Sequence, residues 1–158
     1  NLPGSTFGIE AEEPVKGTLT EMARALKGDI VYLTSEDKVL YHAAAAIACN
    51  YFVTIEKLAT DLWKNFGKSS ADGIKAYMPL LRGTLANIET TGFPKCLTGP
   101  IARGDVATIS RHLKALERCA PELVPLYKQL GRFTVPIGQD KGSLAADKAA
   151  ELRTLLDE

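Results

Sequence analysis

The sequence has few of the residues that build disulfide and metal sites. Its 158 residues include only two histidines and three cysteines. The cysteines, Cys49, Cys96 and Cys119, are odd in number, widely spaced and form no C-x-x-C pair, so they predict neither a disulfide framework nor zinc ligands. We therefore expect reduced thiols, no metal ion and a cytoplasmic protein.

The sequence also has no excess of charge of either sign. Its 19 Lys and Arg residues balance its 19 Asp and Glu residues, and the formal net charge is zero. Nucleic acids and anionic membranes are bound through clustered positive charge, so we expect neither as a partner. The apolar run of residues 43–49 is too short to span a bilayer, and no signal peptide is visible.

Familiar catalytic and phosphate-binding motifs are absent from the sequence. It contains no G-x-G-x-x-G finger, P-loop, H-E-x-x-H or G-x-S-x-G. Any active site would therefore combine several segments, or include residues upstream of Asn1. Because the first residue is Asn rather than Met, we expect the natural N-terminus to lie further upstream.

Residues 1–34 have the pattern of one β-α-β unit. Residues 6–11 and 29–33 are predicted as strands, and residues 18–26 as an intervening helix that stops at Gly28. The almost wholly apolar second strand favours a parallel sheet covered on both faces. Because a single such unit has two exposed edges, we expect it to be the last piece of a larger α/β domain.

From residue 35 onward the pattern is helical, which makes the predicted fold class mainly α. Ser35 is expected to cap a helix that meets no Gly or Pro until Gly67, a length of about 30 residues. Apolar residues form a continuous stripe along this helix: Leu40, Ala44, Ile47, Tyr51, Ile55, Leu58 and Leu62. The alanines of residues 43–46 leave little bulk, so another backbone can approach closely there.

Further helices are predicted over residues 71–90, 106–118 and 122–130, and from Ser143 to the end of the chain. Residues 132–142, which contain Pro136 and two glycines, are expected to form a linker. Gly83 lies inside a predicted helix, where glycine costs up to about 1 kcal/mol relative to alanine. We therefore expect Gly83 to allow close packing.

Three polar residues of the first two long helices are candidates for a site. His42 and Asn50 lie on one side of their helix, because steps of three and four residues stack. His42 suits proton transfer or a substrate hydrogen bond, and Asn50 suits contact with a carbonyl or amide. Asn87 is a candidate for the lining of the same polar notch as His42 and Asn50. In the alternative, His42 binds a neighbouring domain, Asn50 satisfies a loop and Asn87 is an exposed residue.

The glycine-rich segment LTGPIARGD, residues 97–105, is costly to keep ordered unless packing or a ligand fixes it. Thr98 offers a hydroxyl, and Arg103 is a permanent cation suited to a carboxylate or phosphate. Arg103 could equally pair with Asp105, whose simplest role is the N-cap of the next helix. His112, further along, is predicted to be a solvated surface residue.

Together these segments resemble a known family. The residues that carry the resemblance are YHAAA at 41–45, Asn50-Tyr51, Asn87, the 97–105 segment and His112-Leu113. They are similar to Rossmann-like oxidoreductases with a C-terminal domain of unknown function, number 2520. In that family the C-terminal domain is similar to the helical domain of 6-phosphogluconate dehydrogenase, and akin to those of pyrroline-5-carboxylate reductase and ketopantoate reductase.

The resemblance implies an NAD(P)-dependent oxidoreductase. Residues 1–34 would end a Rossmann-like dinucleotide-binding domain, and residues 35–158 would form a helical domain that dimerises and closes a cleft for a small-molecule substrate. The cleft residues it implies are His42 for acid–base chemistry, Asn50, Asn87 and Thr98 for substrate binding, and Arg103 for holding an acidic group. The cofactor would be NADP or NAD. Its phosphate finger is not in this sequence, and no Lys occupies the catalytic place used by β-hydroxyacid dehydrogenases.

A non-catalytic module is the second interpretation. The long helices would then serve only as a dimer interface or ligand-binding scaffold, and the glycine-rich segment would be a structural cap. Because both interpretations include a homodimer, ligand binding is the property that separates them.

Overall fold

The computed structural model describes residues 2–157 and is mainly helical, as expected. The chain divides into two compact units, Asn1–Lys57 and Leu58–Glu158, which we call unit 1 and unit 2 and describe separately. The division falls inside a helix, whereas the sequence predicted a domain boundary between residues 34 and 35. Compactness does not test an assignment of domain identity, so that boundary stays a prediction.

Unit 1 begins with the expected β-α-β arrangement. Strand β1 (Thr6–Ile9) and strand β2 (Asp29–Tyr32) form a two-stranded parallel sheet, joined by helix α1 (Val15–Ala25). Gly28 is needed where the chain returns from α1 to β2, because a Cβ there would lie 2.2 Å from Cε2 of Phe7. The sequence therefore predicted the order and the parallel pairing correctly.

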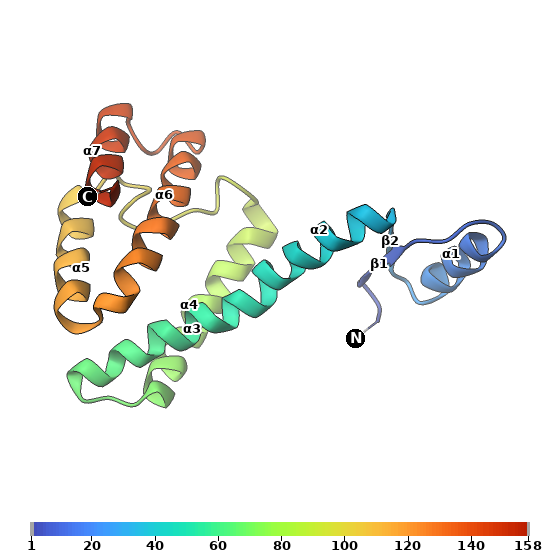
Figure 1. Ribbon diagram of the computed structural model, residues 1–158, viewed down its shortest axis with the longest axis horizontal. Coiled ribbons are helices and arrows are strands. Elements are labelled where there is room, and N and C mark those ends of the chain that lie inside the picture. The colour runs from blue at the N-terminus through green and yellow to red at the C-terminus, as the bar shows by residue number, and fades with distance from the viewer. Residues whose placement is uncertain (1, 158) are drawn as a thin grey trace. The chain divides into compact units, whose positions relative to one another are not determined.

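A long helical segment follows, drawn in cyan to green in Figure 1. It consists of α2 (Ser35–Ala45), a π-helical stretch (Ala46–Tyr51), α3 (Phe52–Asp61) and a 3₁₀ turn (Leu62–Phe66). Gly67 ends it with a left-handed φ of 75°, as the sequence predicted. The cap at its start lies one residue earlier than expected.

That cap is Thr34, not Ser35. The Thr34 hydroxyl accepts a hydrogen bond from the backbone N–H of Asp37, and the Asp37 carboxylate accepts one from the backbone N–H of Thr34. This reciprocal pair satisfies two backbone donors at once, which a Ser35 cap could not do with the same Asp37. The Ser35 hydroxyl instead donates to the carboxylate of Glu10.

The segment Ser35–Phe66 is long and apolar enough to cross a membrane by length and composition, the one such helix among residues 2–157. The apolar stretch is therefore longer than the run of residues 43–49 that the sequence indicated. Length and composition alone do not distinguish a membrane span from a helix that packs on protein. The predictions of no membrane partner and a cytoplasmic location therefore stay predictions.

Unit 2 opens with the packing of α4 (Ser70–Thr91) on the end of the long helical segment. Ser69 caps α4 by the same reciprocal arrangement, here with Asp72. Gly73 brings the helices close, since a Cβ there would lie 3.1 Å from Cβ of Thr60 and 3.2 Å from the Trp63 ring. The Trp63 indole in turn meets the Tyr77 ring edge-on, at 5.6 Å between centroids.

The core of unit 2 lies among its last three helices, α5 (Val106–Cys119), α6 (Val124–Asp140) and α7 (Ala146–Asp157), shown in yellow to red in Figure 1. The buried apolar residues come from all three helices and from the loops beside them: Ile101, Ile109, Leu113, Val135, Leu144, Ala149, Leu152 and Leu156. A 3₁₀ turn (Pro121–Leu123) joins α5 to α6.

Residues 132–142 are not a linker, and this prediction was wrong. Helix α6 runs through Gly131, Pro136 and Gly138 without a break. Gly131 lets α7 approach, since a Cβ there would lie 2.8 Å from Leu156, and Gly138 makes room for the loop residue Leu144, 3.3 Å from the position of its Cβ. Tertiary packing thus overrides the local preference of Gly and Pro.

Gly83 of α4 behaves in the opposite way. Apart from its chain neighbours and the nearby backbone of α4 itself, no atom of the described residues lies within 4 Å of the position that a Cβ would occupy there. The expectation that Gly83 serves close packing is therefore wrong for the chain as described. Its cost to the helix is not offset by a contact.

Candidate functional site

The 97–105 segment is ordered by packing and by its own hydrogen bonds. Ile101 and Ala102 are buried, and the Lys141 ammonium donates a 2.6 Å hydrogen bond to the Leu97 carbonyl. The sharp turns use the predicted glycines, with φ of 98° at Gly99 and 67° at Gly104. Burial of two side chains and this hydrogen bond therefore hold the segment against the rest of unit 2.

One pocket, of about 250 Å³, lies between this segment, α4 and α6. Asn87 from α4 and Thr98 from the segment both line it. The remaining lining residues are mostly apolar: Thr84, Ile88, Phe93, Cys96, Leu97 and Ile137. Two of the residues predicted to bind substrate are therefore brought to one pocket from different elements. We call it the Asn87 pocket.

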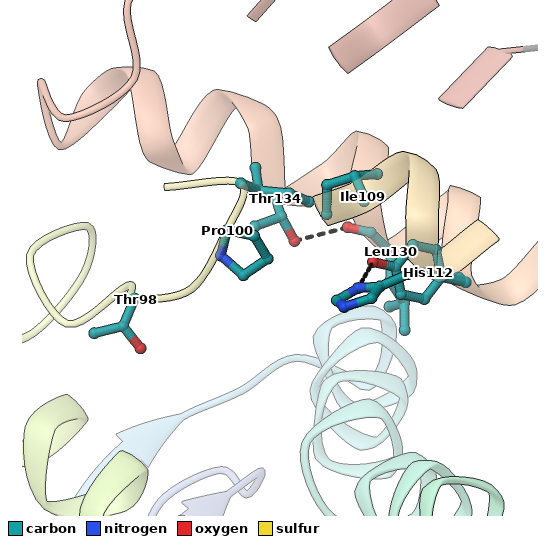
Figure 2. Close-up of a pocket in the computed structure, with 9 residues that line it drawn as sticks. Thr98, Pro100, Ile109, His112, Leu130 and Thr134 are labelled. Carbon is teal, nitrogen blue, oxygen red and sulfur yellow. Dashed lines mark hydrogen bonds between the residues drawn. The ribbon is translucent and has the colours of Figure 1, made fainter. Parts of the chain in front are cut away.

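A second pocket, of about 330 Å³, lies on α5 and α6 and shares Thr98 with the first. Its lining is Thr98, Pro100, Ile101, Ile109, His112, Tyr127, Leu130, Gly131 and Thr134. Figure 2 shows the imidazole of His112 beside Leu130 and Ile109, with Thr98 and Pro100 on the loop side. We call it the His112 pocket.

His112 and Tyr127 form a hydrogen-bonded pair across this pocket. Nδ1 of His112 lies 2.8 Å from the Tyr127 hydroxyl (dashed in Figure 2), and the two rings meet edge-on at 86°. Burial raises the pKa of the Tyr127 phenol above its ordinary value of 10.0, so the phenol stays neutral at physiological pH. His112 is exposed, as expected, but its partner and its pocket were missed.

Arg103 lines neither of these pockets. Arg103 is an exposed residue. The neighbouring Asp105 is the N-cap of α5, as predicted, and accepts from both the hydroxyl and the backbone N–H of Thr108. These bonds hold the Asp105 pKa below 3.8, and the charges of Arg111 and Arg103 add to the shift.

His42 and Asn50 lie in unit 1, both with exposed side chains. His42 is in the last turn of α2, and Asn50 is inside the π-helical stretch Ala46–Tyr51. The wider turns of that stretch change the angular relation assumed for an unbroken α-helix. Such π turns within helices occur frequently at functional sites, a signal that the apolar periodicity did not reveal.

A third pocket, of about 400 Å³, lies at the carboxyl ends of β1 and β2. Its polar lining includes Glu10, Lys16, Tyr32 and Ser35. Lys38 forms a 2.6 Å ion pair with Glu10, and the hydrogen bonds from Lys38 and Ser35 lower the pKa of the Glu10 carboxyl below its ordinary value. In α/β folds this end of a parallel sheet is where ligands bind.

Among residues 2–157, no group of three or more His, Cys, Asp or Glu side chains is placed to hold a metal ion. The sequence did not predict the pair formed by His112 and Tyr127. These residues are 15 positions apart in the chain, and they meet because α5 and α6 pack against each other. No local motif marks such a pair.

Comparison with known families identifies the family of this chain. Residues 5–134 match the model of the family described as Domain of unknown function (DUF2520), so the chain belongs to that family. The match confirms the part of the resemblance that concerns this domain. No curated protein and no solved structure matches the chain.

Proposed function

We propose that this chain, as a member of the DUF2520 family, is the C-terminal part of an NAD(P)-dependent oxidoreductase. In this proposal unit 1 carries the end of the dinucleotide-binding domain, and the helical remainder dimerises and forms one wall of a substrate cleft. A nicotinamide cofactor bound by the complete protein would supply hydride-transfer chemistry for a small-molecule substrate.

The observation that carries the proposal is the meeting of Asn87 and Thr98 at the Asn87 pocket. Their amide and hydroxyl groups stand in an otherwise mostly apolar hollow, which is the usual composition of a small-molecule site. The ordered 97–105 segment keeps Thr98 in place, so the site is preformed.

Two further observations support an α/β cofactor domain in the complete protein. The β1–β2 pair is parallel and has a polar pocket at its carboxyl ends, where such sheets bind ligands. Both strands also keep one unpaired edge, which further strands of the complete protein would cover.

The residues of this chain do not fit the cofactor's diphosphate. A dinucleotide is held by a glycine-rich turn that opens a helix after a strand, and the chain contains no such turn. We therefore assign no residue here to NADP or NAD. In the proposal the cradle belongs to residues upstream of Asn1.

The proposal gives the site residues separate tasks. His42 exchanges a proton with the substrate, because an imidazole ring can both donate and accept a proton. Asn50, Asn87 and Thr98 supply hydrogen bonds to the substrate, and the exposed Arg103 attracts an acidic group.

Cofactor binding by the complete protein tests the proposal. We expect NADPH or NADH to bind saturably to the product of the complete gene, followed by the change in nicotinamide fluorescence. The 158-residue chain is the matched control and should bind neither. Absence of saturable binding to the complete protein would overturn the proposal, whereas unchanged turnover in His42→Ala would remove only the task given to His42.

A non-catalytic helical dimerisation module is the second candidate, and one observation favours it. Large apolar side chains of α2 and the π-helical stretch are exposed, among them Val39 at 74%, Leu40 at 74% and Ile47 at 64%. Exposed apolar surface of this kind is typical of a site where another protein binds. Light scattering that finds a monomer at micromolar concentration would contradict the homodimer included in both candidates.

A further inference from the structure

We propose that the His112 pocket is a second small-molecule site, which takes an uncharged, mostly apolar ligand with one hydroxyl or carbonyl oxygen. It goes beyond the proposed oxidoreductase function and does not rest on it. The geometry that points to it is a preformed apolar hollow with a fixed polar pair at its side.

The hollow has the size and walls of a ligand site. Its volume of about 330 Å³ lies within the range usual for small-molecule pockets. Ile101 and Ile109 belong to the buried core of unit 2, which fixes the floor of the pocket. Pro100 and Leu130 complete the apolar walls.

The lining favours an uncharged ligand. It contains no Asp, Glu, Lys or Arg, so an ion that entered would lose hydration without meeting a permanent counter-charge. The permanent cation of the 97–105 segment, Arg103, does not line the His112 pocket. An acidic substrate suits the proposed cleft and not this pocket.

The polar pair supplies one donor and one acceptor. If the Tyr127 hydroxyl donates to Nδ1 of His112, the imidazole Nε2–H is left to donate and the phenol oxygen to accept. If Nδ1–H donates instead, the phenol O–H and Nε2 take these two tasks. Either arrangement leaves one free donor and one free acceptor, and a single ligand oxygen needs only one of them.

The lining has two other hydroxyls: that of Thr134 is less available to a ligand, and that of Thr98 lies at the margin of the pocket. Thr134 already donates a 2.7 Å hydrogen bond to the Leu130 carbonyl, drawn dashed in Figure 2. Thr98 lies on the loop side and also lines the Asn87 pocket. The ligand oxygen is therefore expected at the His112–Tyr127 pair.

Two-dimensional NMR titration of the 158-residue chain with three probes tests the proposal. The probes share the toluene framework and differ only in the group opposite the methyl. They are 4-methylphenol, which has the single oxygen, toluene, which lacks it, and 4-methylbenzoate, which is charged. We expect saturable shifts at Ile109, His112 and Thr134 with 4-methylphenol, weaker binding of toluene and none of 4-methylbenzoate. One hydrogen bond corresponds to a difference of about three- to tenfold in affinity.

Two variants locate the binding. Tyr127→Phe keeps the ring and should weaken 4-methylphenol by the same factor while leaving toluene unchanged; Tyr51→Phe, in unit 1, is the matched control. Leu130→Trp, at a position that is 41% exposed and so tolerates bulk, should fill the pocket and remove all binding. The proposal is overturned if no probe saturates, if 4-methylbenzoate binds as well as 4-methylphenol, or if neither variant changes binding.

Discussion

Unit 1 and unit 2 differ most in what they bury. Unit 2 has a core in which Ile109, Val135, Leu152 and Leu156 are at most 1% exposed. Among the described residues of unit 1, only Ile9, Thr20 and Ala23 are buried. Hydrophobic burial is the main favourable term in folding, so unit 2 can support itself and unit 1 depends on cover from elsewhere.

The difference also bears on where function can reside. The two pockets that share Thr98 stand on the well-packed unit, where rigid elements hold their lining residues. Unit 1 contributes surfaces instead: a sheet with unpaired edges and a helix with exposed apolar side chains. These are the surfaces that a cofactor domain and a second subunit would cover in the proposed oxidoreductase.

The largest predicted effect comes from the same substitution in both units. Leu152→Ala, at a position with no exposure, should lower the free energy of unfolding of unit 2 by about 2–5 kcal/mol, because it leaves a cavity. Leu40→Ala, at a position of unit 1 that is 74% exposed, should change the free energy of unfolding by less than about 0.5 kcal/mol. Urea unfolding measures both, and equal losses would contradict the comparison.

Two glycines sharpen the description of unit 2. Gly131→Ala places a methyl 2.8 Å from Leu156, and overpacking of this kind typically costs about 1–3 kcal/mol. Gly83→Ala meets no atom within 4 Å and should instead stabilise α4 by up to about 1 kcal/mol. Thermal unfolding should shift in opposite directions, and stabilisation by Gly131→Ala would disprove the packing argument for α6.

The two equivalent caps allow a finer comparison. Ser69→Ala removes the cap of α4, a helix that packs through Gly73 against Thr60 and Trp63, and should lower the stability of unit 2 by about 1 kcal/mol. Thr34→Ala removes the corresponding cap of α2 in unit 1. Because α2 is not part of a buried core, we expect lower helicity by circular dichroism but no shift of the unfolding midpoint of unit 2. A midpoint shift with Thr34→Ala would show that the two units unfold together.

The smallest effect is a dependence on acid. The pKa values of Asp37 and Asp72 lie below the ordinary 3.8, chiefly because the backbone N–H of Thr34 and the side chain of Ser69, respectively, hydrogen-bond the carboxylates. A carboxylate whose pKa is lower in the folded protein than in the unfolded protein contributes its full stabilisation above the unfolded-state pKa. This stabilisation is lost as the pH falls through the folded-state pKa. Stability should therefore decline below about pH 4, with smaller dependence in Asp72→Asn. Both carboxylates are exposed, so each contribution is small.

Local signals predicted much of the fold from the sequence. The strands around residues 6–11 and 29–33, the stop at Gly67 and the cap at Asp105 each depend on neighbours in the chain, and each was found. The errors arose where distant contacts decide. Gly131 and Gly138 suggested a break, but in the structure they accommodate Leu156 and Leu144.

The candidate site was less accessible to sequence reasoning for the same physical reason. Asn87 and Thr98 were singled out, and the fold brings them to one pocket. His112 and Tyr127 could not be paired in advance, because their contact depends on how α5 packs on α6. The π-helical stretch that contains Asn50 likewise leaves no mark in the apolar periodicity.

Hydrogen–deuterium exchange of the 158-residue chain tests the contrast between the two units most directly. Amides open locally with a free energy that reflects the packing around them. We predict the slowest exchange at Ile109, Val135 and Leu152 in unit 2, and exchange faster by orders of magnitude across residues 35–57 of unit 1. Protection of residues 35–57 equal to that of the unit 2 core would contradict the account, because it would show that this chain covers the helix by itself.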